Sequence, residues 1–223
     1  MADFGSNRKT LGIAVISEGV TEKVFYREYF LHVCRKLGLQ VELTTISDTP
    51  ALLISGKMGV ATVLFQSMDS VSQMPNADRW FLNVCIPLYP RYEWHVFLCY
   101  DTDECNDDVT KFYEGDWEIL RSTLRPHAES VVDMAAQADI EDVFLGDKGS
   151  ILRFLDLPDS TPVPFSKKGK RKLRKLFRLA GQTYHPGDRA KALIESLDMD
   201  IVAKNAPRGI NFSSINVLLN KLI

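Results

Sequence analysis

The stretch His95-Val96-Phe97-Leu98-Cys99-Tyr100-Asp101-Thr102-Asp103-Glu104 joins an apolar run to a cluster of acids. The run from His95 to Tyr100 predicts a buried strand, because short apolar runs are typical of strands that are covered on both faces. Side chains two positions apart in extended backbone lie on one face, so Asp101 and Asp103 are expected to point the same way. Ligands of α/β folds bind at the carboxyl ends of the strands. The stretch therefore predicts an α/β fold with two carboxylates at one edge of its sheet.

A second acid-ended strand lies near the start of the chain. The apolar run Leu11–Ile16 is followed by Ser17-Glu18-Gly19-Val20-Thr21-Glu22. If the two strands are parallel neighbours, Glu18 meets Asp101 and Asp103 at the same sheet edge. Clustered carboxylates do not all stay ionised without a compensating cation. A divalent cation with oxygen ligands, Mg²⁺ or Mn²⁺, is the expected partner.

These residues carry a resemblance to a known fold. A hydrophobic strand, then Glu-Gly and a helix, and later a strand ending in Asp-x-Asp, resembles the Toprim fold. The segment Ile16-Ser17-Glu18-Gly19-Val20-Thr21-Glu22-Lys23 is similar to the form found in stand-alone, defence-associated Toprim and RloB-like proteins. The resemblance covers roughly residues 10–150. It implies a Toprim-like parallel sheet flanked by helices, and a catalytic, metal-holding set of Glu18, Asp101 and Asp103.

Two further acids are implied as metal ligands by the same resemblance. Glu22 lies one helical turn after Glu18, and the related overcoming-lysogenization-defect nucleases use a second acid in this region. Glu141 lies in the mixed acidic and apolar segment 139–145, which resembles a Glu-containing segment of RloB-like proteins. A structural role without metal stays open for each of these acids. Glu18, Glu22 and Glu141 could be acids that stabilise the start of a helix. Asp101 and Asp103 could belong to a polar turn after the strand.

The charge of the chain is unevenly distributed. Its 27 basic and 29 acidic residues nearly cancel, but residues 101–147 hold fourteen acids and residues 167–191 hold ten basic side chains. Eight of these cations fall on one segment whose apolar residues recur at helical spacing. That pattern predicts a packed helix with a cationic face for nucleic acid, although a solvated helix face would look the same. The predicted nucleic-acid contacts are Lys167, Lys168, Lys170, Arg171, Lys172, Arg174, Lys175 and Arg178.

Composition limits the remaining classes. The 223 residues are 45% hydrophobic and 25% charged, which is typical of an ordinary globular protein. No apolar run reaches the length of a membrane span, and the N-terminal residues lack the core of a signal peptide, so a cytoplasmic location is expected. The four cysteines form no C-x-x-C pair, and neither zinc nor disulfides are expected. The four histidines are scattered, and no serine–histidine–acid arrangement is recognisable.

Hydrophobic periodicity divides the chain into a catalytic domain over residues 1–150 and a helical, basic subdomain over residues 151–223. Residues 47–59 are expected to form a polar connection, residues 58–68 a helix, and residues 70–93 no central strand, because three prolines interrupt them. The other expected elements are strands at 11–17, 41–46, 95–100 and 130–136 and helices at 20–37, 116–124, 167–179, 190–197 and 215–222.

The functional hypothesis is a Mg²⁺-dependent Toprim endonuclease. It would hydrolyse phosphodiesters of DNA or RNA, transfer RNA included, as an effector of a bacterial anti-phage or toxin system. The chain has neither a P-loop nor a complete GxGxxG, although overcoming-lysogenization-defect nucleases normally carry an ATPase domain. A separate ATPase could therefore be a partner. The alternative hypothesis is a non-catalytic Toprim-like binding module, and the number of metals and the oligomeric state, a homo-oligomer included, stay open.

Overall fold

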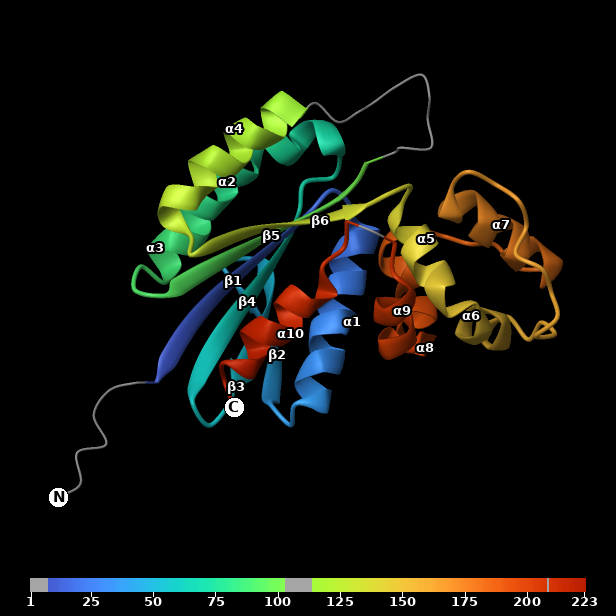
Figure 1. Ribbon diagram of the computed structural model, residues 1–223, viewed down its shortest axis with the longest axis horizontal. Helices are drawn as coiled ribbons and strands as arrows, with labels where there is room; N and C mark the ends of the chain where they lie inside the picture. Colours follow the sequence, from blue (N-terminus) through green and yellow to red (C-terminus); the bar gives the residue numbers. More distant parts are fainter. Residues whose placement is uncertain (1–7, 103–113, 208) are drawn as a thin grey trace.

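A six-stranded sheet forms the centre of the molecule, and helices cover both of its faces (Figure 1). The computed structural model describes residues 8–102, 114–207 and 209–223. The strand order is β2-β3-β4-β1-β5-β6. The strands are β1 (Lys9–Ser17), β2 (Gln40–Ile46), β3 (Thr49–Ser55), β4 (Gly59–Ser67), β5 (Glu93–Asp101) and β6 (Ser130–Ala136). The predicted α/β class is confirmed. The expected parallel pairing holds from β4 through β1 and β5 to β6, whereas β3 pairs antiparallel with both β2 and β4.

Strand β1 lies at the centre of the sheet, and its neighbours bring the acidic strand ends together. It pairs in parallel with β4 on one side and β5 on the other, with Ser17 opposite Cys99. Strand β5 pairs in parallel with β6, with Asp101 opposite Ala136. The carboxyl ends of β1, β5 and β6 therefore lie at the same end of the sheet. The condition under which Glu18 meets Asp101, that the two acid-ended strands are parallel neighbours, is therefore met.

Two predictions between residues 47 and 68 are wrong. Residues 49–55 are strand β3 rather than a connection, and residues 59–67 are strand β4 rather than a helix. Strand β3 follows β2 through a tight turn in which Ser47 and Asp48 take positive φ angles of 48° and 61°. Strand β4 is buried on both faces, so its apolar residues run continuously without the alternation that marks a half-exposed strand.

The helices fall into two layers and a C-terminal group. Helices α1 and α10 lie on one face of the sheet, and η1, α2, η2, α3 and α4 lie on the other (Figure 1). Residues 71–88 are helical, as the prolines that argued against a central strand there allow, and strand β5 begins at Glu93. The helices are α1 (Val20–Lys36), η1 (Val71–Asn76), α2 (Ala77–Trp80), η2 (Phe81–Cys85), α3 (Ile86–Leu88), α4 (Glu114–Leu124), η3 (Arg125–His127), α5 (Ile140–Phe144), η4 (Leu145–Asp147), α6 (Lys148–Phe154), α7 (Gly169–Leu179), η5 (Gly187–Ala190), α8 (Lys191–Ser196), α9 (Met199–Asn205) and α10 (Phe212–Asn220).

Alternate residues of the central strands enter two separate cores. Ile13 and Val15 of β1 pack into the cluster beneath α1 and the C-terminal helices. Ala14 and Ile16 pack into the cluster beneath α2, η2 and α4. Because successive side chains of a strand point to opposite faces, one buried strand supplies both cores.

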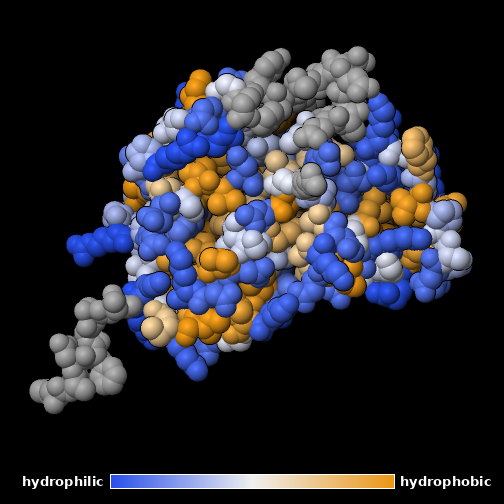
Figure 2. Space-filling model, viewed as in Figure 1, coloured by the Kyte–Doolittle hydropathy of each residue, from blue (hydrophilic) through white to orange (hydrophobic). Residues whose placement is uncertain are grey.

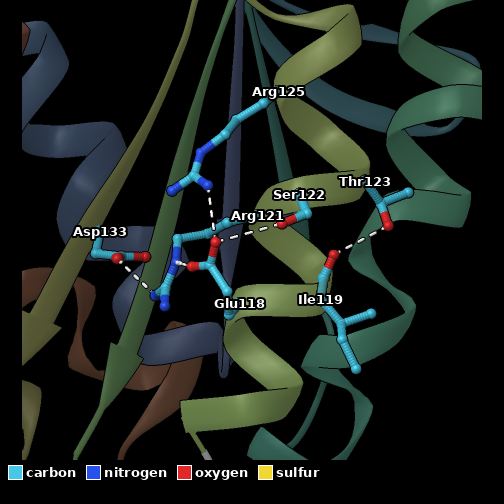
Figure 3. Close-up of polar contacts among 7 residues, drawn as sticks. All are labelled: Glu118, Ile119, Arg121, Ser122, Thr123, Arg125 and Asp133. Carbon is cyan, nitrogen blue, oxygen red and sulfur yellow. Dashed lines mark hydrogen bonds and ion pairs between the residues drawn. The ribbon is translucent and has the colours of Figure 1, made fainter.

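Polar contacts fasten α4 to the sheet (Figure 3). Arg121 donates to Asp133 Oδ2 of β6 at 3.0 Å and to Glu118 Oε2 of its own helix at 3.0 Å. Arg125 reaches the other oxygen of Glu118 at 2.8 Å. Arg121 is buried, so this bridge ties the last turn of α4 directly to β6.

The last helix returns to the sheet. The backbone N–H of Met58, in the β3–β4 turn, donates to Leu222 O at 2.9 Å. The cluster beneath α1 contains residues from both sides of position 150, including Phe25 of α1 and Phe212 of α10. Among the described helices, none combines the length and the apolar character that a bilayer span requires.

Candidate active site

A pocket of about 420 Å³ lies at the carboxyl ends of β1, β5 and β6. Its walls come from the start of α1, the connection after β6, the start of α7 and the turn before η5. Side chains of both charge signs line it. The charged lining residues are Glu18, Glu22, Asp69, Asp101, Asp139, Glu141, Lys168 and Lys170.

Glu18 and Asp101 are in direct contact at the ends of adjacent strands. The N–H of Glu18 donates to Cys99 O at 2.8 Å, and the N–H of Asp101 donates to Glu18 Oε2 at 3.1 Å. Asp101 Oδ1 is buried and has no hydrogen-bond partner among the described residues. Burial, followed by repulsion from Glu22 and Glu18, raises the pKa of Asp101 to about 10. The carboxyl of Asp101 therefore lacks the positive partner that its ionised form would need.

Glu22 is the next acid along the pocket wall. It lies in the first turn of α1 and is buried. Burial, followed by repulsion from Glu141 and Glu18, raises the pKa of Glu22 to about 7, and Lys170 acts in the opposite direction. A Cβ on Gly19 would lie 2.7 Å from Glu22 Oε2. Gly19 has extended backbone (φ −138°), so no unusual turn requires glycine there, and the absence of a Cβ leaves room for the Glu22 carboxylate.

Asp139 holds two helix starts together, a role the sequence did not reveal. Its Oδ1 accepts from Asp142 N at 3.0 Å within α5, and its Oδ2 accepts from Lys170 N of α7 at 3.1 Å. The side chain is buried, and burial raises its pKa. The acid-rich segment could have suggested a cap, but only the fold shows that the cap reaches α7.

Glu141 lies beside Asp139 at the pocket wall. Its side chain is only 2% exposed, and its Oε1 accepts a hydrogen bond from Tyr184 Oη at 3.0 Å. Burial raises the pKa of Glu141, repulsion from Asp139 adds to this, and Lys170 and the Tyr184 hydroxyl oppose it. Burial also raises the pKa of Tyr184, which keeps the hydroxyl a donor. The predicted residue Glu141 thus lies in the same pocket as Glu18, Glu22 and Asp101.

The basic segment divides into three groups. Lys168 and Lys170 line the pocket. Lys172 forms an ion pair with Asp142 at 2.6 Å, and so is already engaged with α5. The remaining cations of the segment lie outside the pocket and are exposed: Lys167, Arg171, Arg174, Lys175 and Arg178.

Two close contacts attach the C-terminal segment to this pocket. A Cβ on Gly169 would collide with the backbone of α5 at Glu141 and Asp142, so glycine lets α7 approach α5. Across the pocket, Gly187 N donates to Thr21 Oγ1 of α1 at 2.8 Å. Gly187 has a φ of +76°, a conformation that favours glycine.

The donor chemistry of the pocket fits a hard cation. Its buried carboxylates supply oxygen ligands, and Asp101 Oδ1 is a buried oxygen without a partner. Within the described segments no three acidic, histidine or cysteine side chains are already placed to hold one ion. The predicted ligand Asp103 lies outside the described residues. The pocket therefore offers suitable oxygens, but a preformed set of ligands is not present in the described part of the chain.

His95 and three cysteines occupy structural positions outside the lining of this pocket. His95 Nδ1 lies 2.7 Å from Ser130 Oγ, and His95 Nε2 lies 3.2 Å from Glu93 Oε1. This chain of contacts joins the starting ends of β5 and β6, at the far end of β5 from Asp101. Cys34, Cys85 and Cys99 are buried free thiols, and Cys105 lies outside the described residues.

No protein family and no curated protein matches this sequence. Among solved structures, a secreted C11 cysteine protease from Bacteroides thetaiotaomicron matches at 14% identity and a TM-score of 0.33, over 62% of this chain and 46% of the protease. The chain thus spans under half of that protein. Futalosine hydrolase of Helicobacter pylori matches at 8% identity and a TM-score of 0.32, over 95% of this chain and 100% of its own. Helicobacter pylori 5'-methylthioadenosine/S-adenosyl homocysteine nucleosidase matches at 10% identity and a TM-score of 0.32, over 95% and 100%. At these scores the matches say nothing of what this chain does.

Proposed function

We propose that this protein is a cytoplasmic, metal-dependent nuclease that hydrolyses phosphodiesters of nucleic acid. One observation carries the proposal: acids from four separate segments converge on one pocket, where Asp101 Oδ1 is buried without a partner. A protein retains such a costly arrangement where the charge has a use, and perturbed acids cluster at functional sites. The Toprim resemblance of the same residues supports phosphodiester chemistry, and it supports a role in an anti-phage or toxin system with a separate ATPase as partner.

Glu18, Glu22, Asp101 and Glu141 would hold Mg²⁺ or Mn²⁺, together with the predicted ligand Asp103. A bound divalent ion supplies charge stabilisation at a phosphate oxygen and lowers the pKa of a bound water. The ionised carboxylates that such an ion needs are disfavoured by burial and mutual repulsion in the pocket. Ion binding and deprotonation of these acids are therefore linked, and both become easier as the pH rises.

The other lining residues have separate tasks. Lys168 and Lys170 place two positive side chains at the pocket, where they attract a phosphate. Tyr184 orients Glu141 through its hydrogen bond and stabilises its ionised form. Asp139 keeps the start of α7, and with it Lys170, against α5.

The test is cleavage of defined substrates by the purified chain. Plasmid DNA, single-stranded DNA and total RNA are incubated with Mg²⁺, Mn²⁺ or EDTA, with and without a candidate ATPase partner. We expect cleavage that EDTA abolishes and that Glu18→Gln removes. Glu195→Gln is the matched control, because Glu195 is a surface acid paired with Lys191 on α8. Binding without cleavage under every metal and partner condition would replace the nuclease by a non-catalytic binding module.

A further inference from the structure

An aromatic side chain stands in solvent beside the basic helix. Phe165 is 91% exposed, more than any other large hydrophobic residue of the described segments. It lies in the connection between α6 and α7, five residues before Lys170. Isolated apolar residues on a surface are common and need no explanation by themselves. The surroundings of Phe165 give this one a specific meaning.

One face of α7 is cationic along its length. Arg171, Arg174, Lys175 and Arg178 follow the spacing i, i+3, i+4, i+7 and are all exposed, and we call them the cationic stripe. Leu173, Leu176 and Phe177 have their own helical spacing on the opposite side and are buried. At 1.5 Å per residue the stripe spans about 10 Å. No acid of the described segments forms an ion pair with its three arginines.

The backbone of Phe165 is attached to this stripe. Lys175 Nζ donates to Phe165 O at 2.9 Å, which holds the loop beside the exposed face of α7. Five residues of chain reach at most about 18 Å, so Phe165 lies within that distance of the pocket lysine Lys170. Figure 2 shows hydrophobic and hydrophilic side chains side by side over the right-hand end of the molecule, where Figure 1 places α7.

We propose that this surface binds single-stranded nucleic acid, with Phe165 stacking on an unpaired base. The cationic stripe holds the phosphates, and the strand continues past Lys168 and Lys170 into the carboxylate pocket. This proposal adds the substrate class to the proposed nuclease function. It rests on that function only in taking the carboxylate pocket as the active site.

The combination of a cationic track and an exposed aromatic ring is how proteins bind single strands. In a duplex the base faces are covered by their neighbours, so an exposed ring has no face to stack on. Phosphate contacts alone would serve a duplex equally well. Phe165 is therefore the residue that separates the two substrate classes.

The experiment measures binding in EDTA, so that it does not depend on cleavage. Fluorescence anisotropy follows labelled 12-nucleotide single strands of DNA and RNA, and a duplex of the same sequence. We expect Phe165→Ala to weaken single-strand binding about tenfold, to leave duplex binding unchanged, and to keep the slope of log K against log salt. Phe165→Trp should restore binding. Leu43→Ala on β2 is the matched control, because Leu43 is 62% exposed and lies on the edge strand far along the sheet from β6.

Changes to the stripe should behave differently. Arg174→Gln with Arg178→Gln should weaken both substrates and flatten the salt slope by roughly 1–2, because two phosphate contacts are lost. The proposal is overturned if wild type binds no single strand, if Phe165→Ala binds single strands as wild type does, or if that variant loses duplex equally. If Phe165-dependent binding is found but no metal supports cleavage, the nuclease function fails and this inference stands.

Discussion

At the scale of single residues, the environment of the Asp101 carboxyl favours its protonated form, whereas the proposed chemistry needs its ionised form. Backbone geometry requires it at the end of β5, beside Glu18, where burial and like charge favour its protonated form. The proposed chemistry requires its ionised form. A bound cation would reconcile the two, because an opposite charge nearby lowers a carboxyl pKa.

Replacing Asp101 by Asn tests this directly. The variant keeps the shape of the side chain and removes its charge. We expect cleavage to fall at least about a hundredfold, the scale on which positioned electrostatic groups act. The metal-free melting temperature near neutral pH should rise, because the wild-type carboxyl must take up a proton on folding and the Asn side chain need not. Calorimetry and a cleavage assay measure both effects, and wild-type activity in Asp101→Asn would remove the residue from the site.

Tyr184 offers a more selective change. Tyr184→Phe removes the hydrogen bond that opposes the raised pKa of Glu141, so that pKa should rise further. Because the proposed role needs Glu141 ionised, the acid limb of the rate–pH profile should move to higher pH, with activity lower by about tenfold near neutrality. Tyr92→Phe is the control, since Tyr92 stacks on Tyr89 away from the pocket. An unshifted acid limb would mean that Tyr184 is only structural.

The raised acids also predict how stability depends on pH. Glu22 has a pKa of about 7 in the folded chain against an ordinary 4.5, so the folded state binds its proton more tightly than the unfolded state. The protonation of Glu22 therefore stabilises the folded state fully below about pH 4, and this stabilisation is lost as the pH rises through 7. The loss in the free energy of unfolding is up to about 3 kcal/mol. In EDTA the melting temperature should therefore be lower at pH 8 than at pH 5.5, and Mg²⁺ should raise it mainly at pH 8. Glu22→Gln should flatten the difference, and a pH-independent melting temperature in wild type would contradict the burial argument.

At the scale of elements, the sequence was most informative where one strand or helix carries its own signal. The runs 11–16 and 95–100 predicted β1 and β5, and their acid ends predicted that Glu18 and Asp101 meet. Strand β4 was not predicted, because burial on both faces removes the alternation of apolar and polar residues that distinguishes a strand from a helix. Helix α9 was not predicted, because residues 199–205 are too few to show a clear helical periodicity of apolar residues.

The site was only partly predictable for a related reason. Glu22 and Glu141 were candidates from the sequence, and both line the pocket. Asp139 and Tyr184 were not, because their roles depend on contacts across long stretches of chain. Asp139 reaches Lys170 N, 31 positions away, and Tyr184 reaches Glu141, 43 positions away. Such contacts follow from how α5, α7 and the turn before η5 pack together, which no local pattern encodes.

Gly169 is where that packing of elements can be tested. A Cβ there meets the backbone of α5, which cannot move aside cheaply, so Gly169→Ala should separate α7 from α5. We expect a loss of about 1–3 kcal/mol in the free energy of unfolding and a loss of cleavage, because Lys170 leaves its place. Gly115→Ala in α4 is the matched control, since nothing lies within 4 Å of the added methyl group, and it should be neutral or stabilising. Equal stability of the two variants would show that α7 is not closely packed on α5.

At the scale of the whole molecule, the C-terminal segment contributes to both the site and the core. Tyr184, Lys168 and Lys170 belong to the pocket, and Gly187 is bonded to Thr21 of α1. Helix α10 packs on α1, with the rings of Tyr29 and Phe212 at a centroid distance of 4.3 Å. The polypeptide thus crosses from the sheet to the basic helix and back before it ends beside the β3–β4 turn.

This arrangement makes a prediction about the expected boundary at residue 150. A fragment of residues 1–150 would expose the face of α1 that α10 covers, including the buried rings of Phe25 and Tyr29, and would lose the hydrogen-bond partner of Glu141. We expect it to aggregate or to unfold without a cooperative transition, as followed by circular dichroism and size-exclusion chromatography. In the full chain, Phe212→Ala should lower the free energy of unfolding by about 3–5 kcal/mol, because Phe212 is buried. Val217 lies on the same helix but is 65% exposed, so Val217→Ala should lower it by under about 0.5 kcal/mol. A soluble fragment with a sharp melting transition would instead establish residues 1–150 as a domain that folds alone, with the C-terminal helices as an attachment to it.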